Sequence, residues 1–409
     1  MAKNRLFSEI PPTAGLPPHW RDLLPCGDGD LARRLAAFLG VEQVQLECSG
    51  TASLVVALTA MQRLCGRRAV VVPAYTCPLV ALAVAHCGLE LRVCDLAPGA
   101  IDFDADALAR LCDRDTLAIV PTHLGGRVAD IATAKAIAAK VGAFVIEDAA
   151  QALGARVGGR SVGLDGDAGF FSLAVGKGLT TFEGGVLVAR DAALREAFAR
   201  VAREIAPFRF GWELKRVLEL VGYHAAYRPS LLGVAYGMPL RRALREGDPV
   251  AAVGDDFSPD IPLHTLGRWR QSIGARAFAR LPDFLAACTA QAQRRKARLA
   301  RIPGIEVVDD PVGADGVWPF FMLRLRDEAT RDGVLRESWG AGVGVSRLFI
   351  HALPDYAYLQ PIVGRFANEG RDVPNARAFA ATMLTVSNSP WLDEATFESI
   401  CAVLDHPPS

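Results

Sequence analysis

Short apolar runs alternate with segments of helical periodicity between about residues 30 and 190 of the chain. Five of the runs read as strands: VEQVQLE, RAVVVPAY, LELRVCDL, LAIVPTHLGG and AFVIEDAAQA. The segments between them predict helices: TASLVVALTAMQRL, PLVALAVAHC and DIATAKAIAAKVG. Continuous β-branched runs joined by crossover helices are typical of a parallel sheet covered on both faces. The pattern therefore predicts an α/β fold with a large central sheet flanked by helices.

The pattern changes after residue 203. Residues 204–262 are amphipathic, aromatic and basic at their edges, and their last part, GDPVAAVGDDFSPDIP, reads as a loop. A single helix is expected from about 265 to 301, and the last hundred residues mix short strands with helices, as a smaller α/β C-terminal domain would. The predicted division is an N-terminal arm (1–29), a large domain (30–203), a helical insertion (204–262) and a C-terminal small domain (263–409).

Composition excludes several classes of protein. The 409 residues carry a formal net charge of zero, so bulk charge indicates neither nucleic acid nor an anionic membrane as partner. Nine cysteines are scattered without a CxxC pair, and the N-terminus has no apolar signal region. No apolar run approaches the length of a transmembrane helix. These features predict a cytoplasmic protein with reduced thiols and without a metal site.

Ligands gather at the carboxyl ends of the strands in such sheets, so the residues that follow each strand are informative. Asp148 follows AFVIE and reads either as the N-cap of a helix or, with Glu147 and Gln151 nearby, as part of a site. His123 follows another strand, where a lone histidine is either a structural residue or part of a site. The segment CSGTASL, Cys48 to Leu54, reads either as a phosphate cradle at a helix N-terminus or as a simple cap.

Two further strand ends carry an aromatic residue and a lysine. Tyr75 and Cys77 follow RAVVVP, and an aromatic there belongs either to the core or beside a flat cofactor ring. In FFSLAVGKGLTTFEGG, Lys177 lies between two glycines at the end of an apolar run, with no charged neighbour before Glu183. Phe171 and Gly178 break the Walker pattern around it, which argues against a P-loop nucleotidase.

An aspartate, a lysine and a helix-N-terminal phosphate site are the fixed protein contacts of pyridoxal 5′-phosphate (PLP). A carboxylate keeps the pyridine nitrogen protonated, so that the ring can take up electrons from the substrate carbon. A lysine binds the cofactor covalently, is displaced by the incoming amine and then shuttles a proton. Apolar surroundings disfavour the charged form of that lysine, which suits both tasks. The strand ends therefore predict a PLP enzyme.

The chain also resembles the sugar aminotransferases of the DegT/DnrJ/StrS type, PLP enzymes with the aspartate aminotransferase-like fold. Five motifs, found in the family's order, carry the resemblance: SGTASL, VPAYTCP, PTHLGG…ADI, IEDAAQALGA and GDAGFFSLAVGKGLTTFEGG. The segment DVPNARAFAATMLTVSNSPWLDEATFESI resembles the family's final helix, strand and helix. The resemblance covers most of the chain apart from 204–262 and implies a large, mostly parallel sheet with a smaller C-terminal domain.

The resemblance implies roles for individual residues. Lys177 takes the place of the lysine that binds the cofactor, and Asp148 that of the partner of the pyridine nitrogen. Gln151 takes a position near the cofactor ring. The phosphate-binding positions fall on Gly50, Thr51, Ala52 and Ser172. The family's stacking aromatic is replaced by Cys77, and Tyr75, two residues earlier, is the candidate substitute.

One family feature is missing. Members commonly carry a GxNxRM-like segment whose Asn reaches the cofactor phosphate of the neighbouring subunit. Here the aligned stretch is IPLHTLGRWRQSIG, which has neither that Asn nor the expected Arg. His264 or Arg268 is the candidate replacement, or the contact is absent.

The resemblance implies an aminotransferase that moves an amino group from a donor such as glutamate to a keto sugar, which is expected to be nucleotide-linked. The expected setting is cell-surface polysaccharide or secondary-metabolite biosynthesis. The alternatives are a PLP-dependent sugar dehydratase or deoxygenase, which Lys177 disfavours because that branch replaces the lysine with His, and a non-catalytic PLP-binding regulator. A homodimer with active sites at the interface is expected.

Position alone suggests four substrate contacts: His123, Arg127, Arg347 and His351. The insertion could cover the active site, form a dimer surface, lie on a membrane through 207–250, or simply pack on its own domain.

Overall fold

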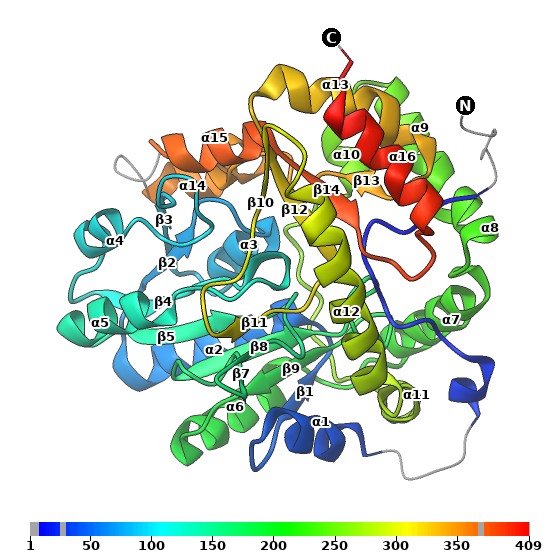
Figure 1. Ribbon diagram of the computed structural model, residues 1–409. Helices are drawn as coiled ribbons and strands as arrows, with labels where there is room; N and C mark the ends of the chain where they lie inside the picture. The colour runs from blue at the N-terminus through cyan, green and yellow to red at the C-terminus, as the bar shows by residue number, and fades with distance from the viewer. Residues whose placement is uncertain (1–7, 25–29, 367–371, 409) are drawn as a thin grey trace.

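The computed structural model of the chain describes residues 8–24, 30–366 and 372–408. A seven-stranded sheet of order β1-β9-β8-β5-β4-β2-β3 forms its centre (Figure 1). The four neighbouring pairs from β8 to β3 are parallel, and β9 runs antiparallel to both β8 and β1. The strands are β1 (Gln45–Glu47), β2 (Ala69–Pro73), β3 (Glu90–Cys94), β4 (Thr116–Ile119), β5 (Phe144–Asp148), β8 (Ala168–Ser172) and β9 (Gly185–Val188).

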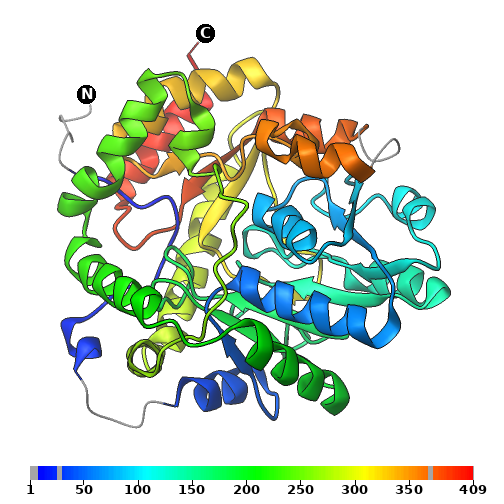
Figure 2. The same ribbon diagram turned by 180° about the vertical axis from the view of Figure 1, so that it is seen from behind.

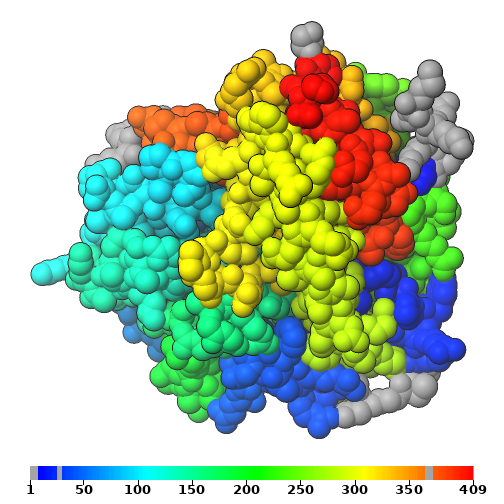
Figure 3. Space-filling view, in the orientation of Figure 1, coloured from blue at the N-terminus to red at the C-terminus, as the bar shows by residue number. Residues whose placement is uncertain are grey.

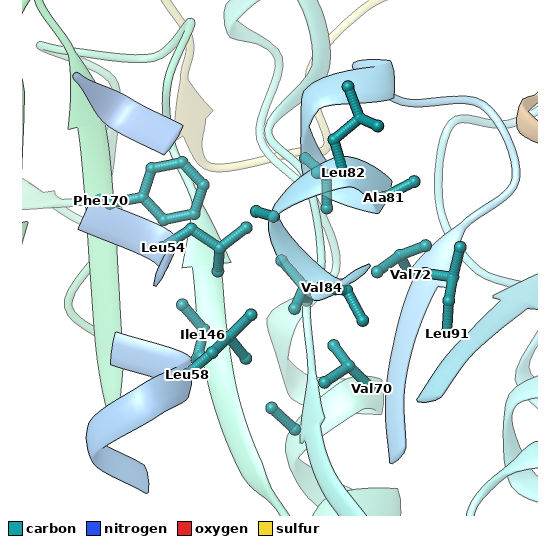
Figure 4. Close-up of a cluster of buried hydrophobic side chains, with 14 of the residues drawn as sticks. Leu54, Leu58, Val70, Val72, Ala81, Leu82, Val84, Leu91, Ile146 and Phe170 are labelled. Carbon is teal, nitrogen blue, oxygen red and sulfur yellow. The ribbon is translucent and has the colours of Figure 1, made fainter. Parts of the chain in front are cut away.

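Helices cover both faces of this sheet, which explains why its strands are continuously apolar. Val70 and Val72 of β2 pack in the cluster that holds helices α2, α3 and α6, whereas Val71 between them packs against α4 and α5. Figure 4 shows the first of these clusters, with Leu54 and Leu58 of α2 beside Ile146 and Phe170. The helices are α1 (Leu31–Leu39), α2 (Gly50–Cys65), α3 (Pro78–His86), α4 (Ala105–Leu111), α5 (Ile131–Val141) and α6 (Ala192–Ile205).

A four-stranded antiparallel sheet of order β10-β12-β14-β13 forms the second, smaller unit. Its apolar cluster joins Phe321 and Leu384 to Phe397 of the last helix. A third, three-stranded sheet of order β11-β6-β7 pairs the 314–315 segment with the large domain. The elements are β6 (Arg156–Val157), β7 (Arg160–Ser161), β10 (Ile305–Val307), β11 (Ala314–Asp315), β12 (Phe320–Leu325), β13 (Val345–Ser346), β14 (Met383–Ser387), α13 (Glu328–Ser338), α14 (Gln360–Phe366), α15 (Pro374–Thr382) and α16 (Glu394–Asp405).

Two expectations about elements are corrected. The helix expected over 265–301 is two helices, α11 (Arg268–Phe278) and α12 (Leu281–Leu299). Pro282 lies in the first turn of α12, where its missing N–H costs nothing, but it cannot continue α11 because its ring would clash with the preceding turn. The strand expected over 41–47 is confined to β1, Gln45–Glu47.

The insertion is helical and contacts both larger units. Helix α7 (Phe210–Ala226) packs Leu220 and Tyr223 against Ile273 of α11, and α9 (Met238–Arg245) packs Leu240 in the cluster of the small unit. A short helix, α8 (Pro229–Leu232), and a π-helical segment (Gly233–Gly237) connect them. The expected loop 247–262 contains one more short helix, α10 (Pro249–Val253). Figures 1 and 2 show α7, α8 and α9 following one another along one edge of the molecule.

The described part of the N-terminal arm runs between the two units. The backbone N–H of Ile10 bonds to the carbonyl of Gly342 in the small unit, and the N–H of Leu16 bonds to the carbonyl of Gly178 beside the lysine (3.0 Å each). In Figure 3 this segment, in blue, lies on the surface next to the C-terminal helix, in red. Among the described residues, no helix is long and apolar enough to cross a membrane.

Candidate active site

A cavity of about 600 Å³ lies at the carboxyl ends of the central strands. Thr76, Thr122, Asp148 and Ser172, which end or follow β2, β4, β5 and β8, all line it. Strand ends converge there because the strands are parallel and their crossover helices lie on the faces of the sheet. The fold therefore brings several of the residues singled out from the sequence to one cavity.

Lys177 reaches this cavity from the loop after β8. Its side chain is partly exposed where it lines the cavity, and no described residue hydrogen-bonds to Nζ. Burial lowers the pKa of Lys177, against the opposing effect of Cys77 and Asp148. Gly176 has a positive φ of 80°, and a Cβ there would lie 2.6 Å from Oγ1 of Thr13, so the turn that presents the lysine requires glycine. The loop thus presents at the cavity an amine whose pKa is lowered by burial.

Asp148 is the last residue of β5 and is buried. Its Oδ1 accepts a hydrogen bond from the N–H of Ala150 (3.0 Å), and no helix follows it, so the alternative N-cap role does not apply. Burial raises the pKa of Asp148 to about 6, although the Ala150 N–H and the charges of Lys177 and His123 act in the opposite direction. A cation at its exposed edge would restore the carboxylate.

The N-terminus of α2 forms the anion-binding part of the cavity. Ser49 caps the helix by accepting from the N–H of Ala52 (3.0 Å), which leaves the first N–H groups of the helix, those of Gly50 and Thr51, without an acceptor among the described residues. A Cβ on Gly50 would come within 3.2 Å of the Cβ of Ser172 across the cavity wall. The cradle is therefore shaped by a glycine and aims free N–H groups and the positive end of the helix at a bound anion.

The structure separates the predicted cofactor contacts into two groups. Those that line the cavity are Gly50, Thr51, Cys77, Asp148, Gln151, Ser172 and Lys177. Ala52 does not line it: the residue is fully buried, and its N–H donates to Oγ of Ser49. Tyr75 also lies away from it: its hydroxyl donates to the carbonyl of Phe349 (2.9 Å), and its ring packs edge-on against Phe349 and Phe379. Burial raises the pKa of Cys77 to about 12, so this thiol stays protonated.

None of the four predicted substrate contacts lines the cavity. His123 is buried, with Nε2 2.9 Å from Oε2 of Glu147 and Nδ1 accepting from the N–H of Ala129. Arg127 is buried in an ion pair with Asp310 (2.5 Å) and lies over the ring of Trp318. The structure gives both side chains structural partners at the base of the site.

The other two predicted contacts flank the cavity wall. Arg347 donates to the carbonyls of Ile350 (2.9 Å) and Ala380 (2.7 Å), and the ring of His351 packs against Tyr356. The residues between them in sequence, Leu348 and Phe349, line the cavity instead. The segment is therefore at the site, with its charged side chains turned away.

The insertion supplies a wall that the sequence motifs did not indicate. Its contributions to the lining are Arg216, Val253, Gly254, Asp255, Phe257, Ser258, Asp260, Ile261 and Pro262. Asp255 is buried and accepts from the hydroxyl of Tyr356 (2.7 Å) and the N–H of Ile350 (2.9 Å), which ties the insertion to the small unit. No motif marks this wall, but residues 253–260 directly precede IPLHTLGRWRQSIG, the stretch that aligns with a cofactor-contacting segment, and Ile261 and Pro262 are its first two residues. His264 and Arg268 of that stretch do not line the cavity, and the ring of His264 stacks on Trp212.

Helix α7 also holds the loop that carries the lysine. Glu213 accepts from Arg270 (Nη2, 2.6 Å), and Arg270 donates in turn to the carbonyl of Glu183 (2.7 Å). Arg216 pairs with the side chain of Glu183 at 2.5 Å. Between these contacts Phe182 has a φ of 71°, a strained value for a residue other than glycine. The insertion thus stabilises an otherwise unfavourable turn at Phe182, five residues after Lys177.

Comparison with known proteins gives one family. The model of the DegT/DnrJ/EryC1/StrS aminotransferase family matches residues 28–225. The chain is 27% identical to the GDP-perosamine synthase of Caulobacter vibrioides over 383 residues, an alignment that covers 92% of this chain and 88% of that protein. It is 36% identical over 200 residues to the L-glutamine:2-deoxy-scyllo-inosose aminotransferase of Streptomyces kanamyceticus, with 47% of this chain and 46% of that protein covered.

Solved structures agree on the fold. The PLP form of the putative sugar aminotransferase Spr1654 from Streptococcus pneumoniae matches with a TM-score of 0.74 at 17% identity, covering 97% of this chain and 98% of that chain. DesI in the presence of its TDP-sugar product matches with a TM-score of 0.72 at 21% identity, covering 98% and 92%. The fold expected from the sequence, a large mostly parallel sheet with a smaller α/β unit, is confirmed.

Proposed function

We propose that this chain transfers an amino group from an amino acid, with glutamate as the expected donor, to the carbonyl of a keto sugar, and the match of residues 28–225 to the DegT/DnrJ/EryC1/StrS aminotransferase family supports this proposal. The protein is a PLP-dependent aminotransferase. One observation carries the proposal: an amine of lowered pKa, a buried carboxylate and an anion cradle share one cavity.

The residues of the cavity fit PLP. The free N–H groups of Gly50 and Thr51, with Ser172, would hold the phosphate, and Asp148 would hold a proton at the pyridine nitrogen. Lys177 would bind the cofactor covalently. When bound, PLP supplies an electron sink for the bonds at the amino-bearing carbon. Cys77 is the lining residue at the family's stacking position, and it offers a thiol in place of an aromatic face.

Two tasks follow for the side chains of this protein. Lys177, once released, takes the proton from the α-carbon of the donor, and its lowered pKa favours the neutral form that this step requires. Asp148 would hold a proton at the ring nitrogen of the cofactor, whose positive charge would oppose the effect of burial on the pKa of the carboxyl group.

We consider two classes of acceptor substrate. A nucleotide-linked keto sugar is the acceptor that the resemblance favours. A keto cyclitol or keto sugar without phosphate is the second candidate, because the insertion adds the carboxylates of Asp255 and Asp260 to the lining. Its cation, Arg216, is already paired with Glu183 and with Glu219 at 2.7 Å. Carboxylates in this position repel a diphosphate and favour a neutral or cationic acceptor.

The test has two stages. Glutamate, glutamine and alanine are mixed separately with the holoenzyme, and an aminotransferase converts the cofactor to its amine form with at least one of them. The enzyme that carries the amine form of the cofactor is then mixed with nucleotide-linked keto sugars or with scyllo-inosose. The acceptor that returns the cofactor to its aldehyde form identifies the acceptor class. Failure with every donor would leave the non-catalytic PLP-binding protein as the better interpretation.

The assembly and setting belong to the same proposal. A homodimer with active sites at the subunit interface, in the cytoplasm, is expected for an enzyme of this kind acting in polysaccharide or secondary-metabolite biosynthesis. Analytical ultracentrifugation of the holoenzyme tests the assembly, and a monomer that turns over at the full rate would contradict it.

A further inference from the structure

Exposed apolar side chains concentrate on the insertion. Thirteen large hydrophobic residues are exposed in the described part of the chain, and seven of them fall between positions 208 and 238. They are Phe208, Phe210, Leu214, Leu218, Leu231, Val234 and Met238, each between 46% and 69% exposed. We call this set the outer face of the insertion. Exposed apolar residues scattered singly are ordinary, whereas this concentration in one short segment indicates an interaction surface.

In helix α7, the residues of the outer face are different from those that pack the helix against the rest of the protein. Leu220 and Tyr223 face inward and pack against Ile273 of α11. Leu214 and Leu218 are one turn apart on the opposite side, where an added Cβ on either neighbouring glycine, Gly211 or Gly222, would meet nothing within 4 Å. The helix is therefore apolar on both faces, and only one face has a partner within the described chain.

The outer face is also positively charged. Residues 207–246 hold seven Arg or Lys residues and three acidic residues. Arg216, Arg241 and Arg242 pair with carboxylates within the protein. The remaining four, Arg209, Lys215, Arg228 and Arg245, are exposed, and among the described residues none of them has a carboxylate partner. Exposed apolar side chains surrounded by free cations are the features of a helix that lies in the interface of an anionic bilayer.

We propose that the outer face of the insertion docks this protein on an anionic lipid surface, with α7, α8 and α9 lying flat on it. Charge decides between this partner and a second copy of the chain. A second copy has a formal net charge of zero, so its bulk charge offers no complement to the unpaired cations of this face. Anionic headgroups complement them instead, at the level where Leu and Phe side chains enter the acyl boundary.

This inference is independent of the proposed function, but the two are connected in space. Arg216 of α7 lines the cavity, so docking would hold the cavity close to the lipid surface. Removal of residues 207–250 is therefore an unsuitable test, since it also removes Glu213 and Arg216, which hold the lysine loop. Point variants on the outer face leave those contacts in place.

The experiment is co-sedimentation of the holoenzyme with vesicles of phosphatidylcholine containing phosphatidylglycerol, and with phosphatidylcholine alone. We expect binding to the anionic vesicles that falls with added salt. Phe210→Ser with Leu218→Ser should weaken it by at least about tenfold, because two apolar anchors are lost. Arg209→Ser with Lys215→Ser should weaken it by roughly fivefold for each cation removed.

Matched controls use residues of the same kind elsewhere on the surface. Leu64→Ser with Val312→Ser removes two exposed apolar side chains, and Arg114→Ser with Arg301→Ser removes two exposed cations. Both controls should bind like the wild type, and thermal melts check that all variants are folded. Wild-type protein that ignores anionic vesicles, or outer-face variants that bind as well as the controls, would overturn the proposal. Variants that change the sedimentation mass of the protein without changing vesicle binding would assign the face to contacts between copies and overturn it equally.

Discussion

The two sides of the cavity are built in different ways. On the sheet side, Asp148 and Lys177 are positioned by backbone, at a strand end and in a glycine turn, and few side chains contact them. On the insertion side, Arg216 and Asp255 are positioned by side-chain pairs with partners as far as 101 residues away in the sequence. Backbone placement leaves a group free to react, whereas Arg216 and Asp255 are held in place by the partners of their side chains. The sheet side is therefore suited to chemistry, and the insertion side to shape and selectivity.

The largest effect is expected on the sheet side, from Lys177→Ala. Loss of the covalent anchor and of the proton carrier should reduce transamination by roughly 10⁴-fold. Lys140→Ala, at an exposed position on α5, is the matched control and should leave the rate unchanged. The measurement is the rate of the donor half-reaction, with borohydride trapping of the cofactor followed by peptide mapping. Trapped cofactor on any of the other lysines would contradict the assignment.

On the insertion side, the main effect of a substitution should be a lower free energy of unfolding. Glu213→Gln leaves the guanidinium of Arg270 buried beside a neutral amide, and the free energy of unfolding should fall by about 3–5 kcal/mol. Glu219→Gln removes the partly exposed partner of Arg216 and should cost no more than about 1 kcal/mol. Urea unfolding of both variants measures the difference. Equal effects would mean that the buried pair does not hold the insertion to the lysine loop.

Asp148→Asn separates stability from chemistry on the sheet side. The folded pKa of about 6 exceeds the ordinary value, so between pH 4 and 6 the folded state holds more protons than the unfolded state and stability falls as the pH rises. Above pH 6 the charged carboxylate costs the cofactor-free protein about 3 kcal/mol, which the Asn variant avoids. Denaturation at pH 4 and pH 8 should show the gain only at pH 8. The same variant should lose about 10²-fold or more in turnover, and a gain at both pH values would argue against a buried charge.

The same contrast explains what the sequence could predict. Strands, crossover helices and the strand-end residues are local features, and the structure has them close to where the periodicity placed them. The positions of Asp148 and Lys177 could be predicted from the apolar runs that they follow. The break at Pro282 was also visible in the sequence, since proline begins helices and cannot continue them.

Side-chain direction is the part that local pattern does not determine. His123 and Arg127 were predicted at the right strand end, but they pair with carboxylates on other elements, the buried Glu147 and the half-buried Asp310, and do not line the cavity. The 347–351 segment reaches the wall with Phe349, while Arg347 caps backbone carbonyls. The insertion reaches the site through contacts between distant segments, and no motif marks Asp255 or Arg216. Long-range pairing has no short-range signature.

The smallest effects are expected from glycine-to-alanine substitutions, one on the sheet side of the cavity and one on the insertion. Gly50→Ala adds a methyl group 3.2 Å from the Cβ of Ser172, and the cradle must widen by a few tenths of an ångström to accept it. We expect PLP affinity, measured by reconstitution of the cofactor-free protein, to fall by about tenfold, the effect of roughly 1 kcal/mol of overpacking. Gly222→Ala in α7 meets no atom within 4 Å and should raise stability by about 1 kcal/mol through helix propensity, with unchanged PLP affinity. If Gly50→Ala binds PLP like the wild type, the phosphate does not lie at the N-terminus of α2, and the anion site must be sought elsewhere along the cavity.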